Sequence, residues 1–267
     1  IKTKKTRKYQ KFKMSPDGKY AAYVTNELGQ YKVWLYDIKE QKSKKIARGE
    51  HKLDRLPDYS HPVLAWHPTS KVLSFIEEKR GELVLNIYEI EEKKRDKRPL
   101  RKMDKVLSMS YNNTGNKLIL SAVKKGQTDL FLYSVIGNNQ KQLTNDIFDD
   151  LSPRFVDNDT RVIFASNRID DTIRKKVPTI QYKKDKDIYI LEIDRIKKPL
   201  TRITNTPSID ESAPSQYTKE RYSYLSNANG IRNRYVAYYD SAISFIDTAV
   251  HYKYFSVTAR MSNYSRD

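Results

Sequence analysis

The chain has 267 residues, which is enough for one large domain or two ordinary ones with a substantial core. It contains no cysteine, so disulfides, thiol nucleophiles and cysteine-based zinc sites are excluded, and no apolar run approaches the roughly 20 residues of a membrane-spanning helix. With 51 Lys and Arg against 33 Asp and Glu, the formal net charge is +18, and the 20 Tyr favour half-buried strands.

In chain order, five segments repeat one arrangement of a tight turn, a strand, a second turn and another strand. Their first turns are centred on Gly18, Ser70, Gly115, Asp159 and Glu220. Successive turn positions lie 52, 45, 44 and 61 residues apart. Propeller repeats run to about 40–50 residues, with four strands per blade. The longer fourth interval contains an insertion, Ile169 to Lys186.

Two spacings inside the first three segments are constant. A glycine follows the turn residue by 11 positions, and a tyrosine follows that glycine by 7. These residues are Gly29 and Tyr36, Gly81 and Tyr88, and Gly126 and Tyr133. Between the turns lie aromatic and β-branched runs, which strands prefer. A β-sandwich with coincidental spacing is the alternative interpretation.

The repeat predicts an all-β fold, a β-propeller of four-stranded antiparallel blades. Five blades are visible, and a complete ring could contain six or more. A basic N-terminal arm (1–8) precedes the propeller (9–267), with blades at about 9–48, 60–102, 103–145, 151–206 and 212–250 and the start of a further blade at 251–267. Within the fifth blade, Ser241 to Val250 is expected to be the fourth strand, with a short helix as the alternative.

Particular motifs in these segments point to a family. The first segment contains Ser15-Pro16-Asp17-Gly18, and fourth strands end in Leu143-Thr144 and Ile203-Thr204 before proline-led strands. Over residues 9 to 240 the chain resembles the TolB-like, WD40-like (PD40) β-propeller repeat family. The resemblance implies a non-catalytic protein–protein interaction module of a bacterial cell envelope, periplasmic or envelope-associated, with another envelope protein as partner.

Three alternatives stay open beside that interpretation. The chain could be the propeller accessory domain of a larger peptidase, with the catalytic domain outside it, since it begins with Ile1 and is expected to be part of a longer or processed protein. It could be a basic scaffold that binds nucleic acid or another anionic surface. A cytoplasmic location is compatible with the absence of cysteine.

Charged loops supply the candidate binding residues. Basic runs at Lys39–Arg48, Lys93–Lys105 and Arg195–Arg202 are expected in hairpins on one face, and an acidic arc that includes Asp146 on the other. The predicted partner-binding residues are Asp149, Asp150, Asp210 and Glu211 in these acidic loops, and Arg174, Lys175, Lys176, Lys183 and Lys184 in the long insertion.

No motif for catalysis, cofactor binding or metal binding is recognised. The sequence contains no Gly-x-Ser-x-Gly, no phosphate-binding Gly-Lys-Ser/Thr and no His-Glu-x-x-His, and its four His are scattered. Alternating oxygens around Asp157 and Asp185 hint at calcium, but Lys186 would repel a cation. We therefore expect a protein that is not an enzyme.

Overall fold

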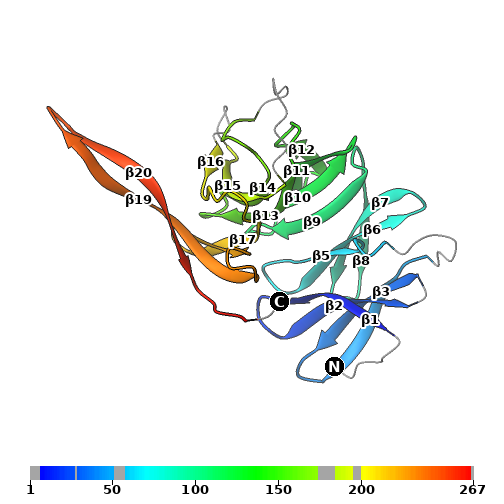
Figure 1. The fold of residues 1–267 in the computed structure, drawn as a ribbon. Helices are drawn as coiled ribbons and strands as arrows, with labels where there is room; N and C mark the ends of the chain where they lie inside the picture. The colour runs from blue at the N-terminus through cyan, green and yellow to red at the C-terminus, as the bar shows by residue number, and fades with distance from the viewer. Residues whose placement is uncertain (1–6, 28, 51–57, 174–183, 195–199, 266–267) are drawn as a thin grey trace. The chain divides into compact units, whose positions relative to one another are not determined.

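The computed structural model describes residues 7–27, 29–50, 58–173, 184–194 and 200–265. These residues form twenty strands in five four-stranded antiparallel sheets (Figure 1). In every sheet the strands are adjacent in chain order, so each is a simple meander.

The strand bounds follow the predicted repeat. The first sheet contains β1 (Lys8–Met14), β2 (Tyr20–Glu27), β3 (Gln30–Asp37) and β4 (Lys42–Arg48), and the second β5 (Val63–Trp66), β6 (Val72–Lys79), β7 (Glu82–Glu89) and β8 (Arg95–Leu100). The third contains β9 (Lys105–Tyr111), β10 (Lys117–Lys124), β11 (Gln127–Ser134) and β12 (Asn139–Gln142). The fourth contains β13 (Asp150–Val156), β14 (Arg161–Ser166), β15 (Asp187–Glu192) and β16 (Leu200–Arg202), and the fifth β17 (Glu211–Thr218), β18 (Arg221–Ser226), β19 (Asn233–Ile246) and β20 (Val250–Arg260).

The chain divides into two compact units. Unit 1 contains residues 1–126 and 132–141, and unit 2 contains residues 127–131 and 142–267. The first two sheets therefore belong to unit 1 and the last two to unit 2, while β11 contributes residues to both.

The repeated turns have the backbone that the sequence predicted. All five first-turn residues have positive φ, with values of 71° at Gly18, 62° at Ser70, 75° at Gly115, 67° at Asp159 and 57° at Glu220. The glycines of the second turns, Gly29, Gly81, Gly126 and Gly230, have positive φ as well. Left-handed backbone is thus the common requirement at these positions, and glycine meets it without a steric penalty.

The three spaced tyrosines occupy matching places. Tyr36, Tyr88 and Tyr133 are each the penultimate residue of the third strand of their sheet. Tyr36 pairs with Ala21 and Tyr88 with Leu73, in both cases the second residue of the second strand. The constant spacing therefore reflects one strand pairing repeated from sheet to sheet.

Each unit has its own apolar core, formed mainly by second and third strands. In unit 1 the core joins the first two sheets through residues such as Val24, Leu35, Leu64 and Phe75. In unit 2 the core joins the fourth and fifth sheets. It contains Val156, Ile163, Ala165, Ile188, Ile190, Ile203, Tyr222, Tyr224 and Ala237.

The C-terminal part of the fifth sheet differs from the prediction. Ser241 to Ile246 continue β19 instead of forming a fourth strand, and the fourth strand is β20. The segment 251–260 therefore pairs with β19 and does not open a further blade. The turn lies at Asp247, whose carboxylate accepts the backbone N–H of Ala249 at 2.9 Å. Without glycine or proline before this turn, nothing in the sequence stops β19 earlier.

The basic runs are also placed differently. Most of the first run lies within β4, and Arg95, Lys97 and Arg98 of the second run lie within β8, so neither run is confined to the hairpin that leads to its strand. Residues 195–199 of the third run, and residues 1–6 of the predicted basic arm, lie outside the described part of the chain. Arg7 is described, and Lys8 already belongs to β1.

Candidate interaction surface

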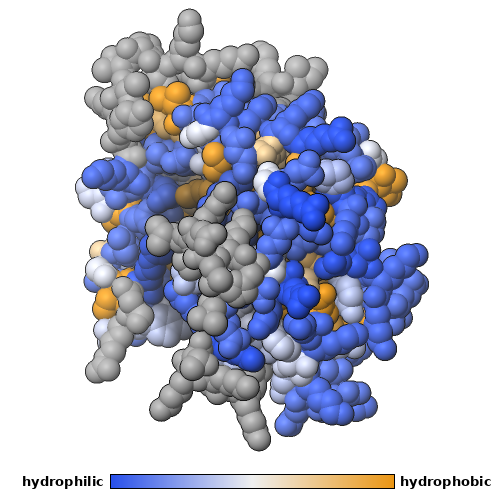
Figure 2. Space-filling view, turned by 90° about the vertical axis from the view of Figure 1, so that its right-hand side faces the viewer, coloured by the Kyte–Doolittle hydropathy of each residue, from blue (hydrophilic) through white to orange (hydrophobic). Residues whose placement is uncertain are grey.

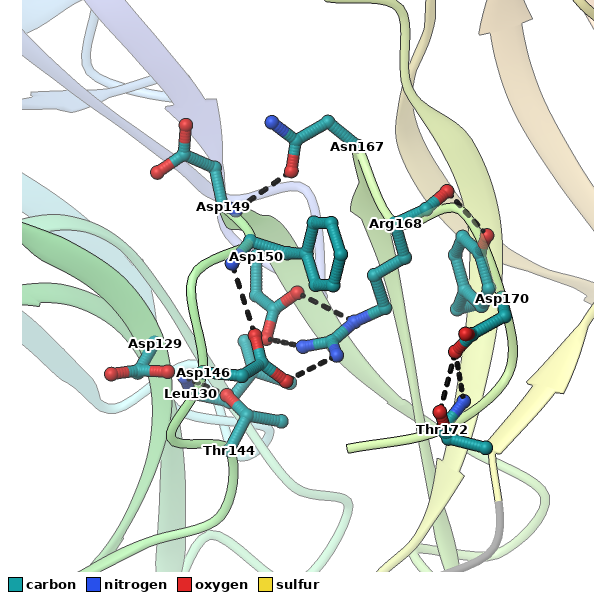
Figure 3. Close-up of polar contacts among 12 residues, drawn as sticks. Asp129, Leu130, Thr144, Asp146, Asp149, Asp150, Asn167, Arg168, Asp170 and Thr172 are labelled. Carbon is teal, nitrogen blue, oxygen red and sulfur yellow. Dashed lines mark hydrogen bonds and ion pairs between the residues drawn. The ribbon is translucent and has the colours of Figure 1, made fainter. Parts of the chain in front are cut away.

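The acidic loop before β13 is folded around a buried arginine (Figure 3). Arg168 follows β14, and its guanidinium binds both oxygens of Asp150, with Nη2 2.6 Å from Oδ2 and Nε 3.2 Å from Oδ1. Its Nη1 donates to Asp146. None of these three side chains is exposed. The loop carboxylates therefore face inward, where they neutralise one guanidinium.

Burial sets the electrostatics of this cluster. Burial raises the pKa of Asp150, although Arg168 opposes the rise. Burial would lower the pKa of Arg168, but Asp150 and Asp146 raise it. Burial, followed by the charges of Asp150 and Asp146, raises the pKa of nearby Asp129 to about 7. Asp129 accepts a hydrogen bond from Gln142 at 2.9 Å. Asp146 and Asp150 thus share one guanidinium, and the raised pKa of Asp129 lies close to neutral pH.

The connection from the fourth strand of one sheet to the first strand of the next, here called a joint, contains the same hydrogen bond at two places within unit 2. At the first joint the N–H of Leu130, next to Asp129, donates to Thr144 Oγ1 at 2.9 Å. At the second joint the N–H of Ile188 donates to Thr204 Oγ1, also at 2.9 Å.

The acid that follows each joint is buried too. Thr204 donates to Glu211, and Thr206 Oγ1 donates to Glu211 Oε1 at 3.0 Å. Asp150 at the first joint and Glu211 at the second are at most 1% exposed. The Leu-Thr and Ile-Thr endings therefore hold the end of one sheet to the start of the next.

This geometry corrects part of the predicted binding loops. Asp150 and Glu211 are buried and internally bonded, so their assignment to an exposed partner-binding loop was wrong. Asp146 is buried as well, so three of the five acids of the predicted arc do not reach the surface. Asp149 is exposed, and half-buried Asp210 is 2.9 Å from Lys186 Nζ. Lys184 is exposed, whereas Arg174, Lys175, Lys176 and Lys183 lie outside the described residues.

A different surface, absent from the predictions, stands out in unit 2. β18 pairs with β19 only from Asn233 to Tyr238, but β19 and β20 remain paired to Ile246 and Val250. Residues 239–256 therefore form a two-stranded hairpin that extends beyond the fifth sheet, here called the arm (orange and red in Figure 1). At its base, Tyr239 donates to the carbonyl of Arg202 and Ser256 to that of Ile203.

The two faces of the arm differ in chemistry. Cross-strand partners share a face, and the register pairs Ser241 with Tyr254, Ile243 with Tyr252 and Ile246 with Val250. This face, beyond its base, carries no charged residue, and we call it the apolar face. Its large side chains, between 44% and 69% exposed, are Ile243, Ile246, Val250, Tyr252 and Tyr254.

The opposite face of the arm contains Asp240, Lys253 and His251 beside aromatic residues. The Phe245 ring stacks on His251 with centroids 4.1 Å apart. This face is therefore mixed in polarity, as an ordinary solvent-facing surface is.

The outer edge of β20 is less protected against pairing with another strand than are the outer edges of the other fourth strands. β4 carries four Lys and Arg in seven residues, and β8 carries three with a proline in six. β12 and β16 have only four and three residues. Basic residues, proline and short length all discourage pairing with another strand. β20 has eleven residues with only Lys253 and Arg260 as permanent cations, so its edge lacks the features that protect the other four.

On the face drawn in Figure 2, the described residues are mostly hydrophilic, and hydrophobic ones form small separate patches. Unit 1 contains a cleft of about 760 Å³ lined by Tyr31, Gly49 and Glu77 and by cations of β4 and β8. Tyr31 donates to Glu77 Oε2 at 2.8 Å. Because Lys and Arg outnumber acids in its lining, this cleft suits an anionic group.

Side-chain clusters bear on metal binding and helices on membrane insertion, in both cases for the described residues only. Among them, no group of three or more His, Cys, Asp or Glu side chains is arranged to hold a metal ion. The same residues include no helix with the length and hydrophobicity needed to cross a membrane.

Comparison with solved structures gives the fold class. TolB from Acinetobacter baumannii is 15% identical with a TM-score of 0.61, over 86% of this chain and 51% of that one. A candidate TolB from Agrobacterium tumefaciens is 12% identical with a TM-score of 0.62, over 95% and 83% of the two chains. The chain thus spans about half the length of the Acinetobacter protein.

Propeller domains of peptidases are similar as well. Prolyl oligopeptidase B from Galerina marginata is 11% identical with a TM-score of 0.59, over 86% of this chain and 33% of that one. The β-propeller domain of the Trilobed protease from Pyrococcus furiosus is 10% identical with a TM-score of 0.52, over 88% and 82%.

No protein-family model and no curated protein sequence matches the chain. Membership of the PD40 repeat family therefore stays a prediction. At these identities the similarity concerns the fold alone, and it confirms the predicted class. The chain is an all-β protein with a TolB-like β-propeller fold, and its described residues form five four-stranded antiparallel sheets.

Proposed function

We propose that the chain is a non-catalytic β-propeller module that binds another protein through the arm. The observation that carries the proposal is the apolar face, five exposed apolar side chains without a charge between them. The chain as a whole is 31% charged, so an uncharged face of this length is an exception on its surface. A contiguous apolar patch of this kind indicates an interaction site that a partner covers when the protein functions.

A location in a bacterial cell envelope, periplasmic or envelope-associated, belongs to the same proposal. Its support is the similarity of fold to two TolB chains. The proposed partner is then another envelope protein.

A second candidate is the propeller domain of a larger peptidase. Its support is the similarity to prolyl oligopeptidase B, of which this chain covers only 33%, and to an isolated protease propeller, of which it covers 82%. A serine-hydrolase or metallopeptidase domain next to this segment in the full-length protein would favour this candidate, and the flanking sequence decides it.

Photo-crosslinking from the arm tests the main proposal. Tyr252 is replaced by p-benzoylphenylalanine in the producing cell, which keeps an aromatic ring at that place. Tyr217 in β17 is the matched control, since it is 56% exposed against 54% for Tyr252. We expect discrete protein adducts from position 252 and none of the same mass from position 217. Equal or absent adducts at the two positions would contradict a binding role for the arm.

Binding to an anionic polymer is the remaining alternative, and the basic cleft is the feature that favours it. Contacts with DNA phosphates release counterions, so the affinity would fall steeply between about 50 and 200 mM salt. A DNA titration at several salt concentrations, with the charge-reversal variant Lys45→Glu in the lining of the cleft, measures this directly. We expect weak binding that is lost at physiological salt.

A further inference from the structure

We propose that the occupant of the apolar face is the arm of a second copy of this chain, related by a two-fold axis. The inference rests on the proposed function, because it names the partner of the same surface. It follows from the net charge of the arm, the order of its side chains and the area that they offer for burial.

Charge decides where two copies can approach each other. The chain carries +18, but the arm contains only Asp240, Asp247 and Lys253 as formal charges, for a net charge of −1. The positive excess therefore lies entirely outside the arm, and two copies repel each other through most of their surfaces. The arm is a place where a second copy can dock without bringing cations together. An acidic partner, in contrast, would be drawn to the basic surfaces and not to an uncharged face.

The order of side-chain sizes along the apolar face allows it to be matched with a second copy of itself. Along it, the pair Ser241–Tyr254 places a small residue beside a large one, the pair Ile243–Tyr252 lies in the middle, and the tip is aliphatic with Ile246 and Val250. A two-fold axis through the middle pair sets the Tyr254 end of one arm against the aliphatic tip of the other. Sheets that pack face to face lie about 10 Å apart, which large side chains from both faces fill.

The area available is sufficient for a specific contact. A large side chain that is about half exposed offers roughly 100 Å² for burial. Five such side chains on each arm give about 1,000 Å² for the pair, which reaches the lower limit expected of a specific interface. An isologous contact of this kind is also the commonest form of protein self-association.

Sedimentation velocity of the purified protein over a range of concentrations and salt tests the inference. We expect a species of twice the 31.4 kDa chain mass that is held together at high salt at least as well as at low salt, because the contact is apolar and salt screens the repulsion between the two positively charged chains. Ile243→Asp places a charge on the apolar face and should weaken the dimer at least tenfold. Ala242→Asp adds the same charge to the neighbouring residue on the opposite face, and should leave the dimer within about twofold of the wild type.

Each other outcome overturns the inference in a recognisable way. A chain that stays monomeric at all concentrations shows that the partner is not a second copy. A dimer that survives Ile243→Asp, or that both variants abolish equally, does not use the apolar face. If the crosslinker at position 252 still gives adducts with a different protein, the proposed function stands and only the identity of the partner changes. Thermal unfolding of both variants checks that neither change unfolds the sheets.

Discussion

Arg168 and Asp150 form a bidentate ion pair inside unit 2, and neither side chain is exposed to solvent. Asp150 begins β13 and Arg168 follows β14, so the pair links the two ends of the β13–β14 hairpin. Because Asp146 joins the same guanidinium, Arg168 compensates two buried carboxylates at once.

Replacing this arginine should be severely destabilising. Arg168→Met keeps the length of the side chain but leaves Asp146 and Asp150 buried without a cation, which costs about 3–5 kcal/mol. Urea unfolding measures the change. Arg232→Met, at a side chain that is 56% exposed and 3.4 Å from Asp210, is the control and should cost less than about 1 kcal/mol.

A compensated variant separates the charge effect from packing. Adding Asp146→Asn and Asp150→Asn to Arg168→Met removes the unpaired charges, and most of the lost stability should return. Failure to recover any stability would mean that the guanidinium acts by filling space.

Asp129 should make stability depend on pH. In the unfolded chain its carboxyl ionises near the ordinary value of 3.8, whereas the folded protein keeps the proton until about pH 7. The folded state therefore binds more protons between these values, so this group lowers stability as pH rises from about 4 to 7 and has no further effect above. The total effect is at most about 4 kcal/mol.

The variant Asp129→Asn isolates this contribution. Its free energy of unfolding, measured in urea between pH 4.5 and 8, should fall less steeply with pH than that of the wild type, and it should be the more stable protein at pH 7.5. Parallel profiles for the two proteins would contradict the raised pKa of Asp129.

The second turn of the third sheet should tolerate asparagine better than valine. Lys125 and Gly126 have φ of 52° and +80°, as in the two-residue turns that favour glycine at their second position. No atom lies within 4 Å of a Cβ added to Gly126, so the cost is that of the backbone alone. Gly126→Val should destabilise by about 1–3 kcal/mol and Gly126→Asn by less. A free energy of unfolding for Gly126→Val within about 0.5 kcal/mol of the wild type would refute the requirement for positive φ at this position.

Gly115 should be more sensitive than Gly126 to the same small change. Both have positive φ, but a Cβ on Gly115 would lie 1.8 Å from His67 Nε2. His67 cannot move freely, since its ring packs edge-on against Tyr111 and its Nδ1 is 2.8 Å from Thr69 Oγ1. Gly115→Ala should therefore cost at least about 1 kcal/mol more than Gly126→Ala in thermal or urea unfolding. His67→Ala in the same chain should recover part of that difference.

The sequence predicted the features that depend on local backbone geometry. Turn positions were found because positive φ selects a narrow set of residues, and the spacing between Gly81 and Tyr88, or Gly126 and Tyr133, follows from the length of a strand. Even the less obvious turn residues Asp159 and Glu220 were placed correctly, because the repeat located them where composition alone would not.

The buried charges could not be found in the same way. Asp, Glu and Arg are mostly exposed in proteins, so Asp150 and Glu211 were interpreted as surface residues. The cation that binds Asp150, Arg168, lies 18 positions later in the sequence. The partners of Glu211, Thr204 and Thr206, are close in the sequence but are neutral residues that give no sign of a buried acid.

One signal of such buried acids was available in the sequence. Asp129 and Asp187 each stand immediately before an apolar-aromatic-apolar run of three residues in two consecutive repeats, and an acid repeated near the start of a buried strand indicates a structural role.

The arm was missed because its length depends on where a strand stops. β19 runs eight residues past its last pair with β18, and the sequence between Tyr239 and Ile246 has the alternation of an ordinary strand. The exposure of Ile243, Tyr252 and Tyr254 follows from the absence of a neighbouring strand, which is a property of the pairing and not of these residues.

Beyond its base, the hairpin formed by residues 239–256 packs against no residue of the two cores described for this chain. If the arm is the proposed binding surface, substitutions there should alter recognition while the melting temperature of the sheets stays almost constant. Under that proposal, the binding partner can change during evolution in small steps that leave the fold intact.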